Sequence, residues 1–338
     1  MSALIDAIKG LLRHSTPAVV LVASIVPVAL IALPMAQDEH ERFEDRYLER
    51  EAIEPPSVEA PPLDLPAFGA GVPVLAYHGI GEDSRFSVTQ EQFAEQMTML
   101  DEAGVETITV DEYVSFLRGE EVDLPERPLL LTFDDGKLSS FRGADAVLAE
   151  HDMNAVMYAI ASETSEGSEY YLSGDELSEM VASGRWEVQA HAGEGHAEIQ
   201  IDEEGHKGPS YAYRAYDESE GLESFAEFGD RVIGDIEAGS ATLAEEVDGY
   251  GDQTFSFPFG AFGQYGTNDE RIPGFLKEQL GSRFEALFYQ PADAGFTYPG
   301  PSDRVQPRFE VRRGTSATEL GEWLSTNSAR SRATLDRG

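Results

Sequence analysis

Four residues in two short segments could bind a metal ion and activate water. Asp134 and Asp135 end the apolar run LLLTF (129–133), and His191 and His196 bracket the segment HAGEGH. Ionised carboxylates at the end of a buried strand are unfavourable unless they are paired or bound to a metal. Two histidines and one carboxylate form a common ligand set for a divalent cation, with positions left open for water. Asp134 or Asp135 could supply that carboxylate.

The spacing of the two histidines predicts a loop rather than a helix. Residues five apart on a helix differ in direction by about 140° and would not share a face. Gly193 and Gly195 lie between the histidines and would allow the chain to fold the second imidazole back toward the first. Solvent-exposed histidines are the alternative for this segment taken alone, but the aspartate pair favours a metal site.

The surrounding pattern predicts alternating strands and helices. Apolar runs predict strands at 72–77, 105–110, 127–133, 154–160, 185–191, 254–259 and 284–290. Helical spacing predicts helices at 89–104, 111–119, 143–151, 173–184, 224–247 and 318–326. This alternation is typical of parallel β/α units and favours an α/β fold, a distorted (β/α)7 barrel. An open doubly wound sheet is the alternative, although no dinucleotide-binding glycine fingerprint is present.

In such barrels, catalytic groups gather at the C-terminal ends of the strands. The polar residues that follow predicted strands include His78, Asp134, Asp135 and His191. His196 follows in the loop. The shared placement of these residues predicts one site.

The N-terminal region predicts one transmembrane helix before the catalytic domain. Residues 15–36 contain no charged side chain and would span about 33 Å as a helix. We expect an uncleaved signal anchor, because the residues around Ala36 fit a signal-peptidase site poorly; a cleaved signal peptide is the alternative. The predicted order is a cytoplasmic tail (1–14), the anchor (15–36), an acidic proline-rich stem (37–70) and an extracytoplasmic domain held at the cell membrane.

The remaining boundaries and the charge complete this outline. The catalytic domain is expected over 71–326 and a polar tail over 327–338. The chain carries 63 acidic and 24 basic residues, a net charge of −39, which excludes nucleic acid as a partner. The composition is similar to that of salt-adapted proteins; a generally acidic secreted protein is the alternative. There is no cysteine, so a metal must be held by His, Asp or Glu.

Four segments resemble the polysaccharide deacetylase family, also called the NodB-homology group or carbohydrate esterase family 4. TFDDG (132–136) is similar to its signature motif, and HAGEGH (191–196) to its second motif in a longer spacing. FSFPFGAFGQ (255–264) is similar to the third motif. PVLAYHGIG (73–81) resembles the opening strand of the branch that contains the poly-N-acetylglucosamine deacetylases. The resemblance runs from about Val72 to Leu324.

This resemblance implies a role for each residue. Asp135, His191 and His196 would bind the metal, and Asp134 would be the general base that takes a proton from metal-bound water. The backbone N–H of Phe259 would hold the oxyanion. The metal is expected to be Zn²⁺, with Co²⁺, Ni²⁺ or Mn²⁺ as alternatives.

The sequence departs from the family pattern in three places. Ser256 stands where the third motif often has arginine, and Arg308 is a candidate to supply that charge, with an exposed arginine as the alternative. Phe259 replaces the common tyrosine. Many members use a late histidine as general acid, but the last histidine here is His206. His78 is a candidate to stand near the leaving amine, with a structural role as the alternative.

Together these features predict a metal-dependent enzyme that removes N-acetyl groups from a surface or extracellular polysaccharide containing N-acetylglucosamine. An O-acetyl esterase and a non-catalytic glycan-binding protein are the alternatives. The aromatic residues of GPSYAYRAY (208–216) are expected either to stack on sugars or to pack a long loop.

Overall fold

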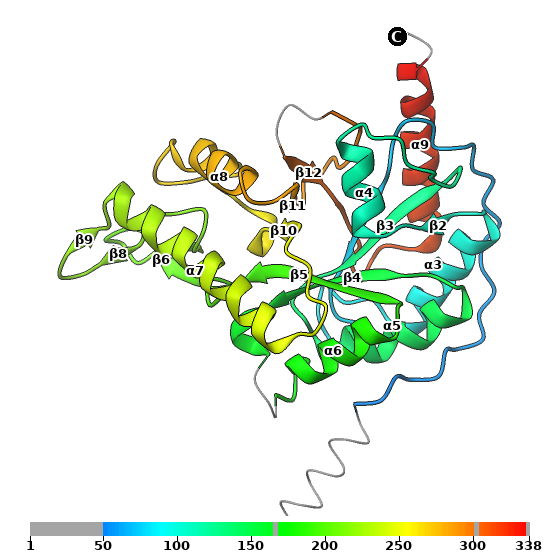
Figure 1. Cartoon of the computed structure of the whole chain (residues 1–338), viewed down its shortest axis with the longest axis horizontal. Coiled ribbons are helices and arrows are strands. Elements are labelled where there is room, and N and C mark those ends of the chain that lie inside the picture. Colours follow the sequence, from blue (N-terminus) through cyan, green and yellow to red (C-terminus); the bar gives the residue numbers. More distant parts are fainter. Residues whose placement is uncertain (1–49, 165–167, 301–303, 336–338) are drawn as a thin grey trace, which may run out of the picture. The chain divides into compact units, whose positions relative to one another are not determined.

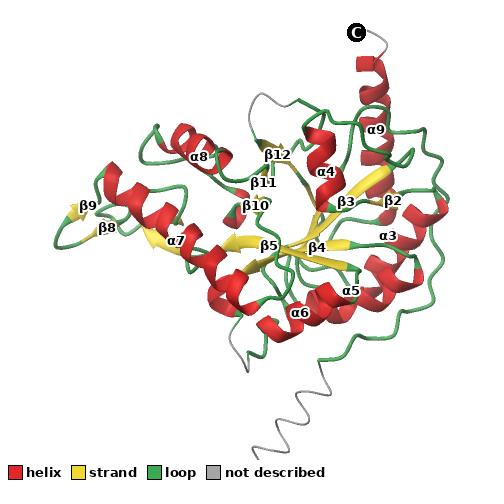
Figure 2. Ribbon diagram, in the orientation of Figure 1, coloured by secondary structure: helices red, strands yellow, loops and turns green. Residues whose placement is uncertain are grey.

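A parallel β-sheet that curves almost into a closed barrel forms the centre of the structure (Figures 1 and 2). The computed structural model describes residues 50–164, 168–300 and 304–335. The strands of the main sheet are β1 (Val74–Tyr77), β2 (Glu106–Thr107), β3 (Pro128–Phe133), β4 (Ala155–Ile160), β5 (Trp186–Ala192), β10 (Thr254–Ser256), β11 (Ala286–Tyr289), β12 (Val305–Pro307) and β13 (Phe309–Glu310). Their order is β12-β11-β10-β5-β4-β3-β1-β13, and β2 pairs with β3 beside this path.

Helices connect most of the strands, as the alternation predicted. They are α3 (Gln90–Glu102), α4 (Val110–Leu117), α5 (Leu138–Glu150), α6 (Gly174–Ala182), α7 (Phe225–Glu246), α8 (Ile272–Gly281) and α9 (Ala317–Leu335), with the 3-10 turns η1 (Ala161–Glu163) and η2 (Pro258–Gly260). Helices α3, α4, α6 and α7 each begin at a Ser or Thr whose side chain forms a capping box, which satisfies free N–H groups of the first turn. Two antiparallel ribbons, β6 (Glu198–Gln200) with β7 (Lys207–Pro209) and β8 (Tyr216–Asp217) with β9 (Gly221–Leu222), lie in the sequence between β5 and α7.

One short segment brings the two ends of the sheet together. Strand β12 pairs with β11, and β13, one residue further on, pairs with β1. Arg308 is the residue between them, and its N–H donates to the Tyr289 carbonyl. The predicted seven-strand count is therefore corrected to a near-closed barrel of eight strands. The segment 305–310 escaped prediction because it has no apolar run, and predicted strand 105–110 forms only the two-residue β2.

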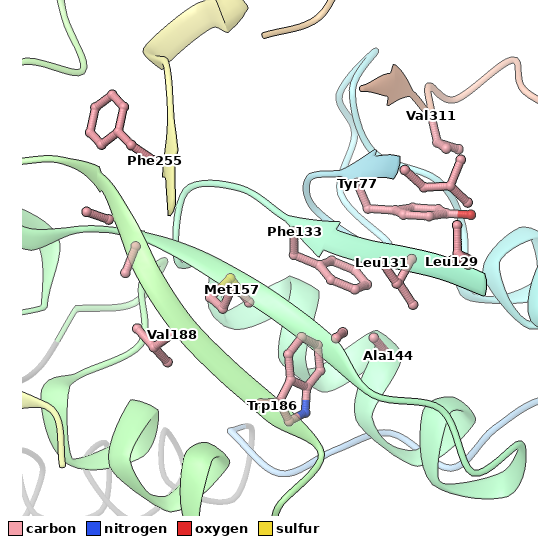
Figure 3. Close-up of a cluster of buried hydrophobic side chains, with 14 of the residues drawn as sticks. Tyr77, Leu129, Leu131, Phe133, Ala144, Met157, Trp186, Val188, Phe255 and Val311 are labelled. Carbon is pink, nitrogen blue, oxygen red and sulfur yellow. The ribbon is translucent and has the colours of Figure 1, made fainter. Parts of the chain in front are cut away.

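Alternate residues of the strands face two separate apolar clusters. The larger cluster contains Leu129, Leu131 and Phe133 of β3 and Trp186 of β5, and Figure 3 shows part of it. Leu130 belongs to a second cluster that includes residues of β4, β11 and α4. Because side chains alternate along a strand, Asp134 continues the Leu130 side. The strand that forms the core thus also aims this carboxylate away from the larger cluster.

The described residues leave the predicted anchor untested. None of the helices in the described ranges is long and apolar enough to cross a membrane. Residues 15–36 lie outside these ranges. Leu65 and Phe68, at the end of the predicted stem, are buried with the main core, and α9 continues past residue 326.

Candidate metal centre

Asp135, His191 and His196 lie together, although the first histidine is 56 residues from the aspartate in the sequence. The Oδ1 atom of Asp135 is 3.4 Å from Nε2 of both His191 and His196. One ligand atom from each residue lies within 4.8 Å of the other two. Oδ1 is buried and receives no hydrogen bond from the described residues. A buried carboxylate oxygen facing two imidazole nitrogens is a suitable site for a divalent cation.

The backbone around β5 fixes the orientation of His191. Its Nδ1 lies 2.8 Å from the Ser256 carbonyl, and because a carbonyl only accepts, Nδ1 carries the proton. When the ring is neutral, its lone pair is then on Nε2, which faces Asp135. Burial alone would lower the pKa of His191, but Asp134 and Asp135 raise it above its usual value. Burial and the neighbouring His191 lower the pKa of His196 to about 4.

Asp135 lies in a backbone turn that separates it from Asp134. Its φ is +78° and that of Gly136 is +71°, so two successive residues are left-handed. Aspartate tolerates this conformation better than most residues. The second oxygen, Oδ2, is 3.2 Å from the Lys137 ammonium, which also contacts Glu82. The turn therefore leaves Oδ1 for the histidines while Lys137 holds Oδ2.

Asp134 is buried and held as a carboxylate by Arg308. Arg308 Nη1 is 2.8 Å from Oδ1 and Nη2 is 2.5 Å from Oδ2. Ser256 Oγ accepts from Arg308 and donates to Oδ2, which also accepts from Gln290 Nε2 at 3.1 Å. Burial would raise the pKa of Asp134, but Arg308 and the neighbouring histidines His191 and His78 lower it to about 2.

The position of Arg308 rules out the exposed arginine that the sequence left open. Its side chain has no exposed surface, and it lies on the seam where the barrel closes. Its guanidinium is also 5.5 Å from the ring centres of Tyr158 and Phe288. Arg308 thus contacts both Asp134 and Ser256, and Ser256 is the residue that stands where the third motif often has arginine.

The two remaining predicted residues lie beside these groups. His78 Nε2 is 4.0 Å from Asp134 Oδ2, and its side chain is 14% exposed. Phe259 has a φ of +57°, which is unusual for a large side chain, and 47% of its surface is exposed. Its ring centre is 4.5 Å from that of His196, at 30° between planes. Backbone strain of this kind is frequent at functional sites.

Sequence analysis missed Gln290 and Lys137, both of which contact the aspartates. Gln290 directly follows β11, so the same strand-end argument that selected His78 and Asp134 would have selected it. Lys137 directly follows TFDDG and is one of only four lysines in the chain. By contrast, Tyr211 in the segment 208–216 is buried, which favours the packing alternative for this residue.

Comparison with known proteins finds similar sequences among the polysaccharide deacetylases. Residues 121–265 match the family model described as polysaccharide deacetylase. The poly-beta-1,6-N-acetyl-D-glucosamine N-deacetylase of Escherichia coli (strain K12) is 25% identical over 274 residues, which cover 76% of this chain and 39% of that protein. The chain spans about two fifths of the length of the curated relatives it matches.

Solved structures share the fold over three quarters of the chain. The structure of IcaB from Ammonifex degensii has a TM-score of 0.58 and 26% identity, and covers 76% of this chain and 98% of that chain. A de-N-acetylase from Aggregatibacter actinomycetemcomitans has a TM-score of 0.63, 19% identity and coverage of 75% and 99%, a likeness of fold. The residues Asp134, Asp135, His191 and His196 all lie inside the segment 121–265 that matches the polysaccharide deacetylase family model.

Proposed function

We propose that this protein is a metal-dependent deacetylase that removes N-acetyl groups from a polysaccharide containing N-acetylglucosamine. The observation that carries this proposal is the division between two adjacent aspartates. Asp135 faces His191 and His196, whereas Asp134 is paired with Arg308 and lies outside that set. One carboxylate is therefore available to a metal and the other to a proton.

A divalent metal held by Asp135, His191 and His196 would polarise the acetyl carbonyl and lower the pKa of a water molecule. Asp134 would accept the proton of that water as it attacks the carbonyl carbon. Its pKa of about 2 keeps it ionised at neutral pH but makes it a weak base, so its position matters more than its basicity. The Phe259 N–H is proposed to donate to the developing oxyanion.

His78 is proposed to give a proton to the departing amine. The C–N bond breaks, acetate is released and glucosamine remains in the polymer. His78 suits this role because its Nε2 is 4.0 Å from Oδ2 of Asp134, the proposed base, and its side chain is partly open to solvent.

Two exposed aromatic side chains support a sugar polymer as substrate. Phe259 contacts His196, and Tyr265, which is 62% exposed, donates to the carbonyl of Gln290. Exposed rings at the edge of a polar site are suited to stacking on pyranose faces. The names of the relatives favour N-acetylglucosamine polymers. Zn²⁺ as the metal and attachment to the cell membrane through residues 15–36, with the domain outside, are further parts of this proposal.

Acetate release from N-acetylglucosamine oligomers, measured with and without chelator, tests the proposal. We expect Asp134→Asn to lose activity and keep metal binding, and His191→Ala to lose both. Activity that survives complete metal removal would overturn the mechanism. Release from O-acetylated but not N-acetylated glycans would favour an esterase, and glycan binding without any acetate release would favour a binding protein.

A further inference from the structure

A single carboxylate in the middle of α7 contacts the loop that carries His196. Asp235 accepts hydrogen bonds from three successive backbone N–H groups, those of Gly193 at 3.1 Å, Glu194 at 2.7 Å and Gly195 at 3.1 Å. The hydroxyl of Tyr211 donates to the same carboxylate. Hydrogen bonds to an ionised acceptor are stronger than those between neutral groups.

Small residues allow α7 to come this close. A Cβ atom on Gly239 would lie 2.7 Å from Cα and N of Gly193. A Cβ on Gly195 would lie 2.7 Å from Asp235 Oδ2 and still closer to the ring of Tyr211. Asp235 and Gly239 are four residues apart, so they share one face of the helix. That face of α7 fits closely against residues 193–196, called the metal loop below.

The same face also holds the chain that follows the loop. Arg231, one turn before Asp235, donates to the carbonyls of Ser210 and Tyr213, each at 3.0 Å. Ser210 Oγ in turn donates to the Gly195 carbonyl at 2.7 Å. The metal loop is therefore held by α7 directly and through the segment 210–213.

We propose that Asp235 is a positioning residue that fixes His196 relative to the other two metal ligands. Asp135 directly follows β3 and His191 lies within β5, where the Ser256 carbonyl orients it. His196 lies four residues beyond β5, and the N–H groups of Gly193, Glu194 and Gly195, the three residues just before it, are bonded to Asp235. The inference rests on the proposed metal centre and adds that α7, through Asp235, holds the loop that carries the third metal ligand.

Metal affinity of Asp235→Asn tests this inference. Asparagine keeps the size but has one acceptor oxygen, and its NH₂ group would face N–H donors. We expect Zn²⁺ affinity, measured by competition with a chromophoric chelator, to fall about 10–100-fold, the usual cost of losing a partner of a metal ligand. Asp230→Asn, an exposed position on the same helix, should leave affinity unchanged. Melting of the metal-free proteins, measured in parallel, reports folding independently of the metal.

A His196→Ala background separates positioning from general destabilisation. If Asp235 acts through His196, Asp235→Asn should weaken Zn²⁺ binding no further once that imidazole is removed. Equal losses in both backgrounds would overturn the inference, as would wild-type affinity in the single variant. Failure of the wild type to bind Zn²⁺ would instead overturn the metal centre itself, and this inference with it.

If Asp235→Asn does not fold, Tyr211→Phe is the second variant to measure. It keeps all three backbone hydrogen bonds to Asp235 and should lower Zn²⁺ affinity by a smaller factor. Wild-type Zn²⁺ affinity in Tyr211→Phe would count against the inference.

Discussion

At the scale of single residues, the ion pair between Arg308 and Asp134 controls both stability and charge in the site. Both side chains are buried, and the guanidinium holds both carboxylate oxygens. In the wild type the pKa of Asp134 is depressed to about 2, so its stabilising contribution is present above the unfolded pKa of about 3.9 and is lost as the pH falls toward 2. The pair therefore couples folding to the ionised state that the proposed base requires.

Removing Arg308 should reverse the sign of this contribution. In Arg308→Met, burial would raise the pKa of Asp134 above its unfolded value, so an unpaired carboxylate would destabilise the protein at neutral pH. We expect the free energy of unfolding at pH 7 to fall by about 3–5 kcal/mol. This gap, the difference in unfolding free energy between wild type and variant, should narrow as Asp134 becomes protonated in acid. Urea unfolding between pH 4 and 8 measures this gap.

Ser256→Ala is the control for the ion pair. It removes the hydroxyl that contacts both Arg308 and Asp134 but keeps the charges. The expected cost is about 1 kcal/mol with little dependence on pH. A gap for Arg308→Met that stays constant across the pH range would contradict an electrostatic origin.

The two histidines of the proposed metal centre should lose their protons in different pH ranges. In the metal-free protein the pKa of His191 is raised, whereas that of His196 is lowered to about 4. A proton on either imidazole competes with the metal, so metal affinity is highest above both pKa values and falls as the pH drops below each of them. At about pH 6 we expect metal binding to release one proton, from His191. Calorimetry in buffers of different ionisation enthalpy counts these protons, and release of none at about pH 6 would contradict the raised pKa of His191.

At the scale of elements, the strands and the helices between them could be predicted, but the closing segment could not. Strand β3 is a continuous apolar run, and its end marks the aspartates. The segment that contains Arg308 has only short pairings on either side, so its burial depends on tertiary structure that no local pattern encodes. The contact of Asp235 with the metal loop is equally non-local, because 40 residues separate it from Gly195.

The loop after β10 should depend on Gly260 for its shape. Gly260 has a φ of +60°, and a Cβ there would lie 1.9 Å from Gln290 Oε1. Gly260→Ala should therefore displace Gln290 from Asp134 and shift Phe259, lowering kcat/KM for acetate release about tenfold or more. Gly274→Ala, in α8 where a Cβ meets nothing within 4 Å, is the matched control and should keep full activity. Unchanged kinetics in Gly260→Ala would show that the loop conformation is not needed for turnover.

At the scale of the whole molecule, the net charge of −39 should make stability depend on salt. Basic residues are too few to neutralise the acidic ones, so the surplus carboxylates repel one another in the folded state more than in the expanded chain. The screening length falls from about 10 Å at 0.1 M salt to about 3 Å at 1 M, which should remove most of this repulsion. We therefore expect the melting temperature of the protein to rise between low and molar NaCl.

The shape of that rise distinguishes screening from salting-out. The screening length falls with the inverse square root of ionic strength, so screening should act mainly at low salt and then level off. Exclusion of salt from the surface should instead grow steadily and be stronger for sulfate. Melting curves in NaCl and Na₂SO₄ at matched ionic strength should then coincide at low salt and separate only at high salt. A melting temperature that does not increase in NaCl would mean that the acidic surface is not adapted to salt, and the excess of carboxylates would need another explanation.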